Sequence, residues 1–219
     1  TTQSAALTSA QVSAFSTEQL AAVETADAKQ LSTQSLQALT TTQIGAFSTQ
    51  AIAAMSTEQI VQGLGTDIVG LGTAQVSALT TAQVVALTTD QLVSGLGAGS
   101  VGLGTEQIVS LTTAQAAALS AVQVVALGTA QVAAFETADA QSLSTQAIQA
   151  FTSAQVGALS TASLAGLSTA QLVLGIGTDI AGLTTAQVVA LSTQQVSSLS
   201  TAQAGALSSL QLGATELSD

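Results

Sequence analysis

The sequence is an unbroken tandem array of eight-residue units, and this period constrains the fold more than any single residue does. Residues 80–87 and 184–191 are identical octads, Thr-Thr-Ala-Gln-Val-Val-Ala-Leu. Counting in both directions from them, residues 8–215 divide into 26 complete octads without an insertion. The consensus is Ser/Thr, Thr, any residue, Gln, Val/Ile/Leu, any residue, a small residue and Leu. Units this short cannot enclose a core alone, so neighbouring octads must pack on one another, as in a solenoid.

A longer period lies above the octad. The sequence Glu-Thr-Ala-Asp-Ala at 24–28 recurs at 136–140, and Gly-Thr-Asp-Ile at 65–68 recurs at 177–180. Both offsets are 112 residues, or 14 octads, which indicates a duplicated block in which 24–71 is echoed at 136–183. Because no linker or change of composition separates the copies, we predict a single continuous repeat domain over residues 1–219.

The consensus octad carries the sequence signature of a helix start. Ser or Thr followed three residues later by Gln is a capping box, as at Ser168 and Gln171. The Leu before the cap and the aliphatic residue after Gln, such as Leu167 and Leu172, have the spacing of a hydrophobic staple. One long helix does not fit, since its apolar positions would rotate by roughly 80° per octad. We therefore predict an all-α repeat solenoid of very short capped helices, one for each octad.

A β-solenoid with sixteen-residue rungs, two octads each, is the alternative. Val, Ile and Thr favour strands, and the Gly-Leu-Gly sites would suit corners. The Ala and Gln content, the three-residue spacing of the two main apolar positions and the capping box favour the helical solenoid instead.

The fifth and eighth octad positions predict the core. The eighth is mostly Leu, and it also holds the four Phe residues and the single Met. This predicted spine is represented by Leu79, Val84, Leu87, Phe15, Phe47, Phe135 and Phe151. Gly63, Gly95 and Gly175 replace the last residue of their octads, and each is followed by Leu or Ile, so the apolar side chain shifts by one position. We predict a change of chain direction at these three glycines.

The residue types in the repeat leave little for catalysis or cofactor binding. The chain has no His, no Cys and no Arg, and its net charge is -11. The usual ligands for zinc, haem and iron–sulfur clusters, and the catalytic groups of His- or Cys-based dyads, are therefore missing. Lys29, the single cation, cannot neutralise the phosphates of nucleic acid or anionic lipid. Without a long apolar run we also predict no membrane insertion, and we expect neither enzyme activity nor a cofactor.

Two binding functions stay open as alternatives. Asp27, Asp67, Asp139 and Asp179 occupy the Gln position of their octads, where they are candidate calcium ligands or simply replace Gln near a helix start. The absence of a D-x-D-x-D-G loop favours the second interpretation. The recurrent Ser/Thr pair is either an array of hydroxyls for an ice- or surface-binding face, or the N-cap and first residue of each helix.

The run Leu-Ser/Thr-Thr-Ala-Gln-Val/Ile-x-Ala-Leu appears at 79–87 and 183–191 and, with Ala after Gln, at 111–119. It resembles the low-complexity octapeptide arrays of long bacterial secreted and surface proteins, many of them adhesin-like, over the whole chain. The resemblance implies an extracellular or cell-surface setting and a structural role as a stalk, spacer or filament subunit. Because the array runs to both ends of the chain without capping units, we expect end-to-end self-association into a homo-oligomeric filament.

Overall fold

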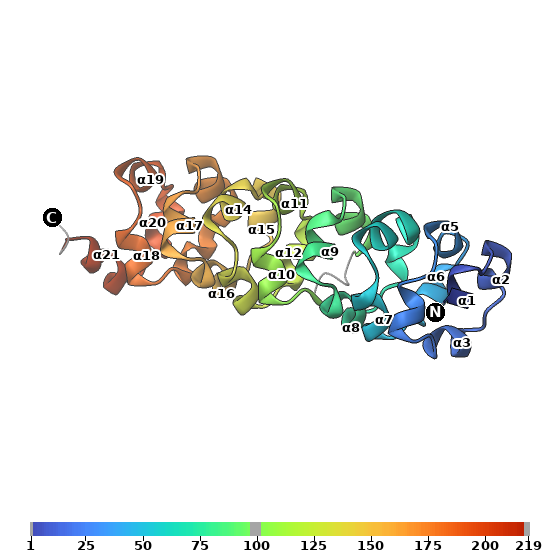
Figure 1. Cartoon of the computed structure of the whole chain (residues 1–219). Helices are drawn as coiled ribbons and strands as arrows, with labels where there is room; N and C mark the ends of the chain where they lie inside the picture. Colours follow the sequence, from blue (N-terminus) through green and yellow to red (C-terminus); the bar gives the residue numbers. More distant parts are fainter. Residues whose placement is uncertain (1, 97–101, 217–219) are drawn as a thin grey trace. The chain divides into compact units, whose positions relative to one another are not determined.

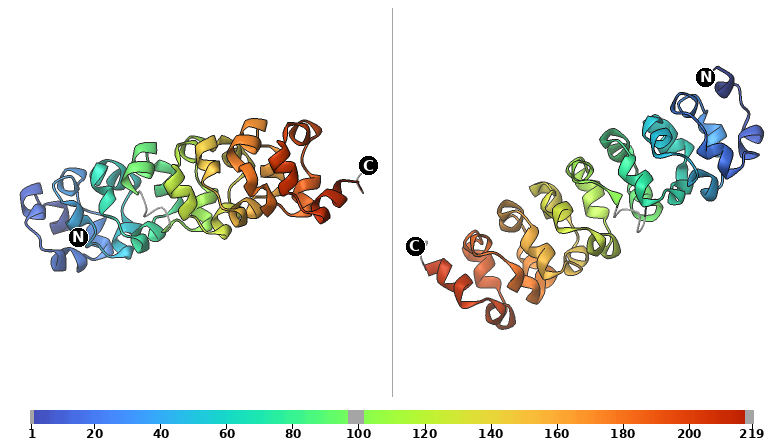
Figure 2. Two further views of the ribbon diagram at one scale, coloured as in Figure 1. Left: turned by 180° about the vertical axis from the view of Figure 1, so that it is seen from behind. Right: turned by 90° about the horizontal axis from the view of Figure 1, so that it is seen from below.

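A computed structural model describes residues 2–96 and 102–216, and short helices occupy nearly every octad (Figure 1). The described residues contain no strand, so the all-α repeat solenoid is confirmed and the β-solenoid alternative is wrong. Close contacts divide the chain into two compact units, residues 1–110 and 111–219, and the further views in Figure 2 show short helices throughout both.

The described helices of the first unit are α1 (Thr2–Ala5), α2 (Ser9–Ser13), α3 (Thr17–Ala21), α4 (Thr25–Ala28), α5 (Thr33–Leu36), α6 (Thr41–Ile44), α7 (Thr49–Ala54), the π-helix η1 (Gln59–Gly63), the 3-10 helix η2 (Gly65–Gly70), α8 (Thr73–Ala78), α9 (Thr81–Ala86), the π-helix η3 (Gln91–Gly95) and α10 (Thr105–Val109).

Those of the second unit are α11 (Thr113–Ala118), α12 (Ala121–Ala126), α13 (Thr129–Ala133), α14 (Thr137–Ser142), α15 (Thr145–Gln149), α16 (Ser153–Ala158), α17 (Thr161–Ala165), the π-helix η5 (Gln171–Ile176), the 3-10 helix η6 (Gly177–Gly182), α18 (Thr185–Val189), α19 (Thr193–Ser198), α20 (Thr201–Ala206) and α21 (Ser209–Glu216).

The capping box starts most of these helices and also limits their length. In α9 the Thr80 side chain accepts a hydrogen bond from the Gln83 N–H at 3.2 Å, and Gln83 Oε1 accepts one from the Thr80 N–H at 2.7 Å. The N-cap residue has an extended backbone, with φ -71° and ψ 156°. Because the next cap follows eight residues later, the described helices before α21 end before completing two turns.

The glutamine of the capping box also joins one turn of the solenoid to the previous one. In the first unit Gln83 Nε2 donates to the carbonyls of Ile52 at 3.0 Å and Met55 at 2.8 Å, which lie 31 and 28 residues earlier. In the second unit Gln155 Nε2 reaches the carbonyls of Val124 at 3.0 Å and Leu127 at 2.8 Å with the same separations.

Helices three octads apart pack side by side, for example α4 with α7 and, in the second unit, α14 with α17 (Figure 1). The glutamine of an octad bonds to the octad four units earlier. Each turn of the solenoid in either unit therefore contains between three and four octads.

The fifth and eighth octad positions line the interior of both units. In most octads the aliphatic residue after Gln is fully buried. The Leu at the end of most octads is at least nine-tenths buried. These two positions meet in the interior because each helix restarts with its octad, so the apolar residues do not drift around a long helix axis. Burying two such side chains contributes roughly 3–6 kcal/mol per octad before the entropy of ordering the chain is subtracted.

Octads that end in glycine form π-helical turns. The Leu64 N–H donates to the Gln59 carbonyl at 3.0 Å, five residues back, so one more residue enters the turn and Leu64 fills the core at 2% exposure. Gly65 then takes φ +53°, and Gly177 takes φ +55° in the second unit. Glycine is needed at both because other residues rarely adopt this backbone conformation.

We predict that Gln83→Ala lowers the free energy of unfolding by about 2–4 kcal/mol, because the Thr80 N–H and the Met55 carbonyl lose their hydrogen-bond partner. Chemical denaturation followed by circular dichroism measures the change. Gln62→Ala is the control, since Gln62 is exposed, and it should change stability by less than about 0.5 kcal/mol. Equal effects of the two substitutions would contradict the structural role of the buried carboxamide.

A second prediction concerns close packing at Gly95. A Cβ added there would lie 2.3 Å from Ile68 Cγ2, whereas a Cβ at Gly205 in α20 would have no neighbour within 4 Å. Gly95→Ala should therefore destabilise the protein by about 1–3 kcal/mol, and Gly205→Ala should stabilise it by about 0.5–1 kcal/mol. Thermal melts of both variants check this, and a Gly95→Ala variant as stable as wild type would refute it.

Candidate functional site

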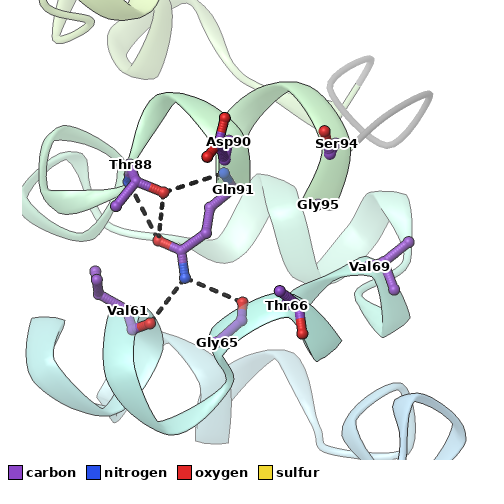
Figure 3. A pocket seen from close by; sticks show the side chains of 9 residues that line it. All are labelled: Val61, Gly65, Thr66, Val69, Thr88, Asp90, Gln91, Ser94 and Gly95. Carbon is purple, nitrogen blue, oxygen red and sulfur yellow. Dashed lines mark hydrogen bonds between the residues drawn. The ribbon is translucent and has the colours of Figure 1, made fainter.

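A hollow of about 440 Å³ opens on the first unit where η1, η2 and η3 come together (Figure 3). It forms where two octads end in glycine and widen into π-helices, η1 and η3, with the 3-10 helix η2 following the first. The lining residues that the structure describes are Val61, Gly65, Thr66, Val69, Thr88, Asp90, Gln91, Ser94 and Gly95.

The carboxamide of Gln91 is the central polar group of this hollow (Figure 3). Its Oε1 accepts from the Thr88 N–H at 3.1 Å and from the Thr88 hydroxyl at 3.3 Å. Its Nε2 donates to the carbonyls of Val61 at 2.8 Å and Gly65 at 3.0 Å. Both amide hydrogens and the oxygen are thus used within the protein and are not offered to a ligand.

The other lining groups do not form a catalytic constellation. Val69 is 55% exposed, and Thr66, Ser94 and Asp90 are exposed as well. Among the described lining residues Asp90 is the one ionisable side chain, and the lining holds no second acid or base that could activate a hydroxyl together with it. The second copy has Ala202 where the first has Asp90, so this chemistry is not repeated in the array.

The four candidate calcium ligands lie in separate octads with different surroundings. The Ser4 hydroxyl donates to Asp27 Oδ1 at 2.7 Å, and the Ser153 hydroxyl donates to Asp179. Asp67 is half-buried in the first turn of η2, and Asp139 is buried in α14. No group of three or more acidic side chains that could hold a metal ion is found in the part of the chain that the structure describes.

Asp139 differs from the other three because the residue is 3% exposed and its buried Oδ2 has no hydrogen-bond partner among the described residues. Burial raises the pKa of this carboxyl, and the nearby Glu136 carboxylate raises it further. The pattern of acidic residues in the sequence did not single out this site.

The predicted spine residues lie in the interior of their units. Val84 is fully buried, Leu79 and Leu87 are each 4% exposed, and Phe47, Phe135 and Phe151 are buried, whereas Phe15 is half-buried.

The three glycines at which a change of chain direction is predicted lie at close packing contacts. A Cβ at Gly63 would lie 2.8 Å from Leu36 Cδ1, one at Gly175 would lie 2.9 Å from Ile148 Cγ2, and Gly95 has the contact to Ile68. The positive φ angles occur two residues later, at Gly65 and Gly177. Gly97, which completes the Gly-Leu-Gly motif after Gly95, lies outside the described residues.

Besides its role in the capping box, where Glu serves equally well, the regular Gln of the repeat allows rows of amides to pair between neighbouring units. The structure shows the form of this pairing, in which the amide donates to backbone carbonyls of the preceding turn. Glu is found at the Gln position in no octad of this chain, although it occurs at other positions. The absence of Glu at this position indicates the second role in the sequence, because only the amide supplies donors for the carbonyls of the preceding turn.

Comparison with known families identifies the repeat. A family model described as the ALTTAQ repeat matches residues 20–57, 31–70, 65–94, 132–169 and 177–214, which together make up more than half of the chain. The six residues Ala-Leu-Thr-Thr-Ala-Gln occur in this order at 78–83. Neither the curated proteins nor the solved structures gave a match.

We predict that calcium does not stabilise this protein, because the four aspartates lie apart and two of them accept hydrogen bonds from serine hydroxyls. Thermal melts in millimolar calcium and in excess chelator, followed by circular dichroism, should coincide. A melting temperature that rises with calcium concentration would instead support a calcium-binding role of these aspartates.

Proposed function

Because the chain belongs to the ALTTAQ repeat family, we propose that it is a non-catalytic structural protein, an extracellular stalk or filament segment built from octads. The observation that supports this function best is the glutamine contact, which has the same register in both units. Gln59 reaches the Leu31 carbonyl at 2.7 Å, and Gln187 reaches the Leu159 carbonyl at 2.6 Å, in each case 28 residues earlier.

Because the glutamine contact repeats with the same register, the array can be built to different lengths. Each octad interacts with its own helix and with octads three and four units away, so stability grows with the number of neighbours. Adding octads extends such an array without a new kind of interface. This property suits a spacer or fibre, whose function depends on reach.

The composition of the surface supports the same role. The second octad position is mostly Thr, and the charged residues amount to 6% of the chain. None of the helices in the described part of the chain has the length and apolar run that a membrane span requires. A single Lys and no Arg leave few sites for trypsin-like proteases, which favours persistence outside the cell.

The glutamine contact also provides a way for turns to join end to end. Gln11 and Gln19 use Oε1 for their capping boxes, and within the described residues no acceptor is found for their exposed Nε2 groups. Leu199 and Leu207 occupy the last position of their octads. The carbonyls of Phe47 and Leu79 at that position accept from a glutamine 28 residues later. A turn of octads stacked on these groups, from the same protein or from a second copy, would complete the bonds.

We predict that the purified chain forms thin fibres whose length rises with concentration, and that Gln11→Glu with Gln19→Glu keeps it monomeric at neutral pH. Glu preserves both capping boxes but removes the amide donors. Negative-stain electron microscopy and sedimentation velocity measure assembly, and the melting temperature verifies folding.

Gln34→Glu with Gln62→Glu is the matched control, because both residues are exposed in the first unit and the change of charge is the same. If this pair also prevents assembly, charge repulsion and not the glutamine contact is responsible. A wild-type chain that stays monomeric at every concentration would exclude the filament and leave the stalk.

A further inference from the structure

The buried carboxyl of Asp139 occupies a place where most octads have the bridging glutamine. Its Oδ2 is enclosed and has no partner in the described part of the chain, and no other buried side-chain N or O atom there shares this condition. The Ser142 hydroxyl nearby donates to the backbone carbonyl of Asp139 and not to its carboxylate. A group of this kind needs an explanation, because an unpaired buried carboxylate is costly.

An ionised carboxylate cannot do what the glutamine amide does. The amide of Gln donates two hydrogen bonds toward backbone carbonyls, whereas a carboxylate only accepts. A protonated carboxyl recovers one donor. The chemistry of the site therefore favours the neutral form of Asp139.

No cation offsets a negative charge at this place. α14 packs against α11 and α17, and neither helix contains an ionisable side chain. The one charged group from its own octad is Glu136 at the N-cap, which repels a second negative charge. Lys29, the single cation of the chain, belongs to the other unit.

Asp27, the counterpart of Asp139 in the first copy of the duplicated block, has a hydrogen-bond donor beside it. Asp27 lies 112 residues before Asp139, is half-buried, and accepts a hydrogen bond from the Ser4 hydroxyl in α1. The residue 112 positions after Ser4 is Ala116, which is fully buried in α11, the helix packed against α14. Asp139 therefore has the carboxyl of Asp27 without the hydroxyl donor that Asp27 has.

We propose that Asp139 is a proton-operated switch in the second unit: the neutral carboxyl keeps α14 packed against α11 and α17, and ionisation loosens this turn. The preference for the neutral form sets the direction in which stability changes with pH. Because folding raises the pKa of Asp139 above its ordinary value, the stabilisation is complete below that ordinary value and is lost as pH rises through the raised pKa. The second unit should thus be more stable against unfolding in mild acid than at neutral pH.

The experiment measures the unfolding equilibrium of the full chain by chemical denaturation between pH 4 and pH 8. In the wild type the unfolding constant should rise by about tenfold for each pH unit between the ordinary and the raised pKa, and then level off. Asp139→Asn should remove this dependence. Asp90→Asn, a change at an exposed carboxylate, should keep it.

Ala116→Ser provides an independent test, since it restores the hydroxyl of the first copy while keeping Asp139. It should reduce the change of the unfolding constant with pH. It should also lower the pKa of Asp139, which NMR titration of the carboxyl carbon measures. A wild-type profile without the slope, or an Asp139→Asn variant with the wild-type slope, would overturn the switch. Calcium that abolishes the slope in the wild type would overturn it too, because a cation and not a proton would then neutralise the site.

Discussion

The solenoid depends on one side chain that bonds in two directions. The octad glutamine accepts from the N–H of its own N-cap and donates to carbonyls 28 and 31 residues earlier. Helices of four to six residues are too short to persist alone, because most of their backbone groups lie outside intrahelical hydrogen bonds. By satisfying groups in its own helix and in the preceding turn, the glutamine links the formation of a helix to the stacking of the array.

The remaining octad positions follow from this contact. The extended N-cap stops the previous helix and turns the chain, so the fifth and eighth residues of most described octads point to the interior of their unit. A small residue precedes the last Leu because helices three octads apart lie close together. Where glycine takes the last position, a π-helical turn admits one more residue and Leu64, Leu96 or Ile176 fills the core instead.

Much of the fold could be predicted from the sequence because its rules are local. The capping box acts within four residues, so Ser168 and Gln171 identify a helix start without knowledge of the tertiary structure. The number of octads in a turn could not be predicted, since it depends on contacts about 28 residues apart. The hollow beside Gln91 and the burial of Asp139 also depend on how turns stack, and the sequence pattern alone did not distinguish Asp139 from Asp67.

In an array of near-identical units, new behaviour arises where a residue and its neighbour in the adjacent turn change separately. Ser4 and Asp27 form a matched pair in the first copy, whereas Ala116 and Asp139 do not in the second. Each octad contacts only a few others, so an unmatched carboxyl affects one turn and leaves the contacts of distant turns intact. The two copies thus share a common scaffold, and the absence of a hydroxyl donor for Asp139 makes the stability of one copy depend on pH.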